Sequence, residues 1–134
     1  MQLLFYPSGS DKDSKRLQAA VHKIIPDGRI EHFKALSDLR QRLRTPVAPN
    51  SVAVLSASSR EELQKIQALR ELLTEIYVVL VIPDRKKSTI KLAHHLLPRF
   101  LSQIDSDFAD LKTVLNRMYL NSQESDDRES LKEA

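Results

Sequence analysis

The stretch Ser51-Val52-Ala53-Val54-Leu55-Ser56 is followed further along the chain by Tyr77-Val78-Val79-Leu80-Val81-Ile82. Both runs are almost continuously apolar, which is typical of parallel strands covered by helices on both faces. Between them, residues 59–75 are predicted to form a helix, because apolar side chains recur there at helical spacing: Leu63, Ile66, Leu69, Leu73 and Ile76. The two runs therefore predict a pair of central strands joined through a helix.

The same alternation of a strand and a helix continues on both sides of this pair. Strands are predicted over residues 3–6, 29–33 and 100–104, and helices over residues 10–25, 36–44, 88–97 and 107–120. The first and last of these helices each carry one apolar stripe, formed by Leu17, Ala20, Val21 and Ile24 and by Phe108, Leu111, Leu115 and Met118.

Helix boundaries carry ordinary start signals, because serines stand at four predicted N-cap positions: Ser10, Ser37, Ser59 and Ser88. Strands joined through helices by short connections form a parallel sheet with right-handed crossovers. The predicted fold class is therefore α/β, a three-layer (βα)5 sandwich with a five-stranded parallel sheet.

The length of 134 residues fits one domain, which we assign to residues 1–121, followed by a polar acidic C-terminal tail over residues 122–134. The tail has five acidic and two basic residues, a net −3, which leaves +6 on the rest of a chain whose total is +3. Two functional roles are considered for the tail, a tether to another domain and an acidic segment that competes for a basic surface. The favoured interpretation is a solvated extension of the last helix.

Composition excludes several classes of chemistry. The chain has no cysteine, so disulfides, thiol catalysis and cysteine-ligated metals are absent. No apolar stretch approaches the roughly 20 residues of a membrane span, and no basic and then apolar segment of a signal peptide precedes the first strand. We therefore expect a cytoplasmic location.

In doubly wound sheets, ligands bind beyond the carboxyl ends of the strands, so the loops there determine the chemistry. The loops over residues 7–10, 56–59, 83–87 and 103–106 are rich in hydroxyl groups and poor in carboxylates. Holding Mg²⁺ against a phosphoryl group requires hard anionic oxygens, and an acyl phosphate requires an acceptor carboxylate. These loops therefore disfavour phosphoryl transfer.

Over residues 1–121, and in the order of every element, the chain resembles the CheY-like receiver domains of bacterial two-component response regulators, which have a flavodoxin-like fold. The resemblance places the acidic pair of that family on Pro7 and Ser8, and the phospho-accepting residue on Ser56. The two conserved switch positions of the family fall on Ile82 and Gln103. The family usually has acidic residues at the first three of these positions, a Thr or Ser at the fourth and a lysine at the fifth. None of the five residues is of the expected type, so the resemblance is to the degenerate members, the pseudo-receivers.

This resemblance implies a non-enzymatic protein-protein interaction module in bacterial signalling or regulation, with no catalytic residues, no cofactor and no metal. The alternative is a flavodoxin-like enzyme or small-ligand sensor that binds an anion at the serine-rich loops. Its candidate pocket comprises Ser8, Ser10, Ser58, Asp84 and Asp105. A relocated metal site on the two aspartates is a further alternative, but local turn or cap hydrogen bonds are favoured for them.

Basic residues just before the fourth helix and apolar residues on it predict a partner surface, although solvated helix ends are the favoured interpretation of the basic patch. Arg85, Lys86 and Lys87 form the densest positive patch, and an acidic protein partner is its best functional use. The helix over 88–97 is apolar on more than one face, and the resemblance implies dimerisation or partner binding through the fourth helix, fifth strand and fifth helix. The alternative is that this helix is simply buried more deeply. The candidates there are Leu92, His95, Leu96 and Tyr119.

Two other patterns are given less weight. A second positive patch is predicted from Arg40, Arg42 and Arg44 on the short helix. Nucleic acid is a disfavoured partner for either patch, because the chain lacks a helix-turn-helix signature and stacking aromatic residues among its basic ones. The adjacent pair His94 and His95 is not a good metal site, because neighbouring helical residues point about 100° apart.

Overall fold

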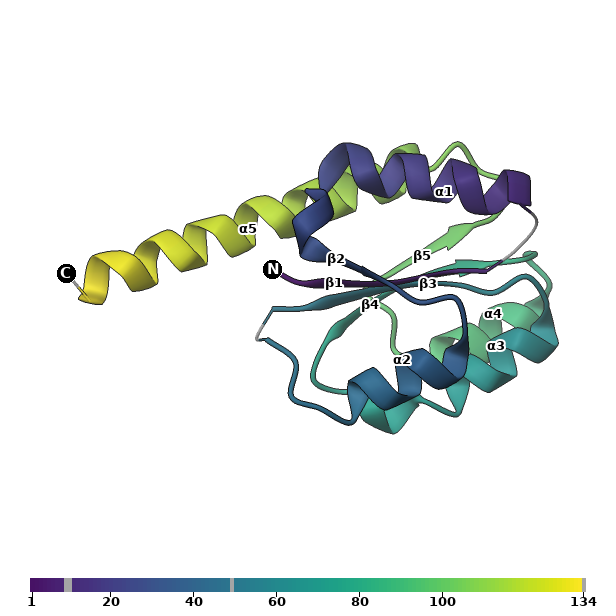
Figure 1. Ribbon diagram of the computed structural model, residues 1–134. Coiled ribbons are helices and arrows are strands. Elements are labelled where there is room, and N and C mark those ends of the chain that lie inside the picture. The colour runs from purple at the N-terminus through teal and green to yellow at the C-terminus, as the bar shows by residue number, and fades with distance from the viewer. Residues whose placement is uncertain (9–10, 49, 134) are drawn as a thin grey trace.

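The computed structural model describes residues 1–8, 11–48 and 50–133, with side chains described except for Asp11 and residues 123–133. Five parallel strands form one sheet in the order β2-β1-β3-β4-β5 (Figure 1). The strands are β1 (Leu3–Pro7), β2 (Ile30–His32), β3 (Val52–Ser56), β4 (Tyr77–Ile82) and β5 (Phe100–Gln103). The predicted α/β fold with a five-stranded parallel sheet is therefore confirmed.

Helices cover both faces of the sheet (Figure 1). Two of them, α1 (Asp11–Ile24) and α5 (Ala109–Glu133), lie on one face. The other face is covered by α2 (Leu36–Leu43), α3 (Arg60–Gln67) and α4 (Lys87–His94). Two short 3₁₀ turns, η1 (Asp27–Arg29) and η2 (Arg70–Leu73), complete the described elements.

Strand β3 is the centre of the molecule, and each of its residues is buried. Ala53 and Leu55 point into the core under α2, α3 and α4, whereas Val52 and Val54 point into the core under α1 and α5. This alternation explains why residues 52–55 are all apolar, because each face of a strand covered on both sides needs apolar side chains.

The predicted helix over residues 59–75 is instead α3 followed by η2. Leu69, between the two, has φ −91° and ψ 0°, and the Leu72 N–H donates to the Leu69 carbonyl at 2.9 Å. The 3₁₀ turn tightens the backbone while Leu69 and Leu73 stay buried, at 4% and 3% exposure. An apolar stripe alone does not distinguish one long helix from this pair, since both keep the stripe on the sheet.

The last helix is longer than predicted, because α5 continues from Ala109 to Glu133 and its end projects beyond the sheet (Figure 1). The backbone of the acidic tail therefore extends the last helix, as the favoured interpretation predicts. No helix in the described part of the chain is long and apolar enough to cross a membrane.

The serine caps differ from prediction at two of the three positions that the structure describes. The Ser59 side chain accepts a hydrogen bond from the Glu62 N–H at 3.2 Å, as expected of an N-cap. However, α2 begins after Ala35 and α4 after Lys86, neither with a side-chain cap, so Ser37 and Ser88 lie inside their helices. Ser10 lies outside the described residues.

We predict that Ser59→Ala lowers the free energy of unfolding by about 1 kcal/mol, because it removes an N-cap hydrogen bond. Ser37→Ala and Ser88→Ala serve as matched controls, and each should change stability by less than about 0.5 kcal/mol or raise it slightly. Urea unfolding followed by circular dichroism measures all three. Equal losses for the three variants would contradict this assignment of the cap.

Candidate functional site

The strand register brings the predicted loops together at the carboxyl end of the sheet. Pro7 of β1 pairs with Ser56 of β3, and Ser56 pairs with Val81 of β4. On the other side of β4, Ile82 pairs with Gln103 of β5. The positions that the resemblance assigns to the receiver site therefore lie at the carboxyl end of the sheet, on neighbouring strands.

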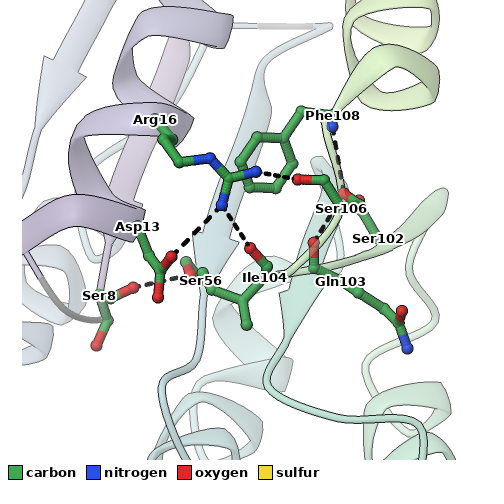
Figure 2. A network of polar contacts seen from close by, with 9 residues as sticks. All are labelled: Ser8, Asp13, Arg16, Ser56, Ser102, Gln103, Ile104, Ser106 and Phe108. Carbon is green, nitrogen blue, oxygen red and sulfur yellow. Dashed lines mark hydrogen bonds and ion pairs between the residues drawn. The ribbon is translucent and has the colours of Figure 1, made fainter.

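Ser56, at the phospho-acceptor position, is buried and committed to a structural hydrogen bond. It has no exposed surface, and its hydroxyl donates to the Ser8 carbonyl at 2.9 Å. This contact ties the end of β3 to the loop after β1 (Figure 2). The hydroxyl satisfies a backbone acceptor at the strand edge, and Pro7 and Ser8 beside it provide no carboxylate.

The two described serines of the candidate anion pocket do come together. The Ser8 hydroxyl lies 3.4 Å from that of Ser58, and the Ser58 hydroxyl donates to Glu62 Oε2 at 3.0 Å. Burial raises the pKa of Tyr6, and the nearby Glu62 carboxylate adds to the rise. A carboxylate at these serines opposes the binding of an anion, which disfavours the anion-sensor alternative. Ser10 lies outside the described residues.

The two loop aspartates do not form a metal site with their neighbours. Asp84 Oδ1 accepts the Lys86 N–H at 2.9 Å, and the Thr89 hydroxyl together with this amide holds the pKa of Asp84 below its usual value. Asp105 is exposed beyond β5. Among the described residues, no group of three His, Cys, Asp or Glu side chains is placed to hold a metal ion. Asp84 therefore serves the turn that precedes α4, as the favoured interpretation predicts.

The main feature that sequence reasoning missed is Arg16, which extends from α1 to the loop between β5 and α5. Its Nη1 donates to the Ile104 carbonyl at 3.3 Å and lies 3.4 Å from Asp13 Oδ1, and its Nη2 donates to the Ser106 carbonyl. The guanidinium also lies over the Phe108 ring, 5.1 Å from its centroid. Figure 2 shows these contacts converging on one side chain. Arg16 therefore joins α1 to the loop that leads from the carboxyl end of β5 into α5.

The β5–α5 loop under Arg16 is held by its own hydrogen bonds. The Ser106 hydroxyl donates to the Gln103 carbonyl at 2.9 Å and accepts the Phe108 N–H at 3.2 Å. Phe108 has φ 61°, which costs a non-glycine residue about 1–2 kcal/mol. Its ring is 2% exposed, so burial and the cation–π contact offset that cost.

A small groove lies between this loop and α4, along β5, which is an edge strand. It has a volume of about 290 Å³, and Arg85, Ile90 and Phe108 are among its lining residues. Both positions that the resemblance assigns to the receiver switch, Ile82 and Gln103, also line it. We call it the β5 groove.

The predicted partner surface is only partly assembled. Arg85, Lys86 and Lys87 are exposed, and Arg85 reaches the β5 groove. Leu96, however, is only 6% exposed, so it belongs to the core and does not contribute to a partner surface. The exposed apolar residue of this segment is Leu97, three residues after the end of α4, which is 86% exposed and has φ 50°.

The remaining partner candidates are spread over different parts of the molecule. Leu92 is half-buried against the core under α4. His95 is exposed, and its Nδ1 lies 2.8 Å from Gln67 Nε2 of α3. Tyr119 is half-buried against the other core, on the opposite face of the sheet from α4. These side chains therefore do not form one continuous patch.

No protein-family model matches the chain, and no curated protein sequence matches it. Solved structures are similar over most of its length. A putative pilus assembly-related protein from Burkholderia pseudomallei K96243 has a TM-score of 0.61 and 17% identity, covering 88% of each chain. The phosphorylated cyanobacterial phytochrome response regulator RcpA has a TM-score of 0.58 and 14% identity, covering 87% of this chain and 90% of its own.

The Mn²⁺-bound response regulator Rcp1 is similar as well, with a TM-score of 0.55 and 15% identity over 88% of this chain and 91% of its own. The chain has the receiver-domain fold. Its flavodoxin-like architecture is therefore confirmed, and the functional consequences depend on the residues at the carboxyl end of the sheet.

We predict that Arg16→Met increases amide hydrogen exchange in residues 104–108 roughly fivefold, corresponding to about 1 kcal/mol of local stability. The arginine is about a third exposed, so the loss stays below that of a fully buried charged hydrogen bond. Lys15→Met, an exposed neighbour on α1, is the control and should leave this loop unchanged. Unchanged exchange in Arg16→Met would contradict a restraining role for the guanidinium.

Proposed function

We propose that this chain is a receiver-like domain that does not accept a phosphoryl group and that acts as a protein-protein interaction module in bacterial signalling or regulation. The observation that carries the proposal is the end of β3, where a buried serine donates its hydroxyl to the Ser8 carbonyl at 2.9 Å. Two of the similar structures are named as response regulators, which is consistent with such a role. We also propose a cytoplasmic location.

The chemistry of the strand ends supports the loss of phosphorylation. A phospho-acceptor must be a carboxylate to form an acyl phosphate, and Mg²⁺ prefers carboxylate ligands. Pro7, Ser8 and Ser56 supply none. Asp13, the nearby carboxylate in Figure 2, lies 3.4 Å from the Arg16 guanidinium, which already balances its charge.

Without an acceptor, a phosphoryl group does not select between two conformations of the domain. Regulation then requires a partner, an oligomer or a ligand that binds one conformation more tightly. The arrangement around Arg16 favours a domain that presents a preformed surface, because the β5–α5 loop is held from α1 and by Ser106. Its mechanism is docking, with no catalytic residue.

The proposed docking face combines the β5 groove with a basic rim, which we define as Arg85, Lys86 and Lys87. Arg85 lines the groove, and all three side chains are exposed at the start of α4. Apolar walls bordered by cations suit an acidic protein partner, whose charges speed association and select the orientation of binding. The resemblance to receivers adds homodimerisation through α4, β5 and α5 as a second use of the same side.

We predict that reversing the basic rim with Arg85→Glu, Lys86→Glu and Lys87→Glu reduces recovery of a bound protein partner roughly tenfold, because rim charges govern association. The measurement is chemical cross-linking in the native cells to the full chain, followed by mass spectrometry. Lys12→Glu, Lys15→Glu and Lys23→Glu make the same charge change on α1 and serve as the control. The same partners at the same yield from the rim variant would contradict the proposed face.

A further inference from the structure

A second groove lies between α2 and α3. It has a volume of about 540 Å³, and Leu36, Ala68 and Leu69 provide its apolar surface. Arg40 of α2, Arg44 at the C-cap of α2 and Lys65 of α3 line it as well. These six residues define the α2–α3 groove, which is separate from the β5 groove and its basic rim.

The geometry of α2 explains why two of the three arginines on this helix and at its C-cap line the groove. Arg40 and Arg44 are four residues apart and so share one face of the helix. Arg42 lies elsewhere, and its Nε donates to Glu31 Oε1 of β2 at 3.0 Å. The predicted patch of three arginines is therefore wrong as a single surface, because Arg42 is committed to the edge of the sheet.

Among the described residues, the cations of the groove form no ion pair with a carboxylate. Within the described residues, the ion pairs are those of Arg16, His22 and Arg42, and none involves Arg40, Arg44 or Lys65. Three exposed positive charges thus surround an apolar surface. Such a groove fits a helical segment that brings several carboxylates, because charge complementarity selects the partner and the apolar surface adds area.

A segment of matching charge is present in the chain itself. Helix α5 is packed on the domain as far as Ser122, which is 5% exposed. Its backbone then continues as helix over residues 123–133, about 16 Å at 1.5 Å per residue. This end has five acidic and two basic residues, a net −3, against the +3 of Arg40, Arg44 and Lys65.

The position of this segment favours an intermolecular contact. Figure 1 shows the end of α5 projecting from the layer of α1 and α5, whereas α2 and α3 lie on the opposite face of the sheet. We propose that the acidic end of α5, residues 123–133, docks in the α2–α3 groove of a second copy of this chain. In the proposed dimer the contact is reciprocal, with the acidic end of each copy docked in the groove of the other. This inference does not depend on the proposed loss of phosphorylation or on the basic rim.

The absence of cysteine makes a direct test possible, because one introduced thiol is unique in the chain. The full chain with Ser130→Cys is labelled with a nitroxide and mixed with ¹⁵N-labelled wild-type chain. We expect intermolecular paramagnetic broadening of amide signals in residues 36–44 and 65–69. Raising the ionic strength from about 0.01 M to about 1 M shortens the screening length from about 30 Å to about 3 Å and should remove the broadening.

A charge exchange distinguishes this contact from general association. Arg40→Glu with Arg44→Glu should abolish the broadening, as should Asp126→Lys with Asp127→Lys in the labelled chain. Mixing the groove variant Arg40→Glu with Arg44→Glu and the labelled tail variant Asp126→Lys with Asp127→Lys should restore the broadening. Lys23→Glu with Arg29→Glu, the same charge change away from the groove, should leave it unchanged, and circular dichroism verifies that each variant is folded.

Two results would overturn the inference. One is an absence of intermolecular broadening at residues 36–44 and 65–69 in the wild-type mixture at low ionic strength. The other is undiminished broadening in the folded double variant Arg40→Glu with Arg44→Glu, which would show that the acidic end does not bind in the α2–α3 groove. Neither result would bear on phosphorylation at Ser56.

Discussion

The pairing of the buried strand β3 with β1 and β4 is the constraint on which the rest of the structure depends. Its side chains enter both cores, so a slip of one residue in its register would exchange the side chains that pack under α2, α3 and α4 with those that pack under α1 and α5. That register places Pro7, Ser56 and Val81 side by side at one end of the sheet. The loops that define the candidate site are therefore brought together by the packing of apolar strand residues, which are not themselves part of the site.

At that end of the sheet, the polar groups bond mainly to one another. Ser56 donates to a backbone carbonyl, Ser58 donates to a carboxylate, and Arg16 binds the loop that leads into α5. A receiver that is switched by phosphorylation needs carboxylates free to hold Mg²⁺ and an acceptor ready to react. Here the same fold holds a network of hydrogen bonds, which supports a docking role and explains how Phe108 is kept in a left-handed backbone conformation.

Much of the fold could be predicted because periodicity reports burial directly. The strand over residues 77–82 has the predicted bounds, and β3 differs by one residue. The contacts of Arg16 could not be predicted, because its loop partners are backbone carbonyls far along the chain that leave no pattern in the sequence. The one sequence pattern that involves Arg16 is its position three residues after Asp13 on α1, which allows the two charged side chains to meet. Leu96 was assigned to the surface because a helix that is apolar on several faces does not reveal which face meets the sheet.

The central claim is that the carboxyl end of this sheet does not bind a phosphoryl group. The most direct test is the amide ¹H–¹⁵N spectrum of the chain before and after addition of Mg²⁺ with beryllofluoride, which mimics a phosphoryl group on a receiver aspartate. The account predicts no localised shifts at Ser8, Ser56, Asp84 or Asp105. Saturable shifts confined to these residues would contradict it and would identify a working anion or metal site.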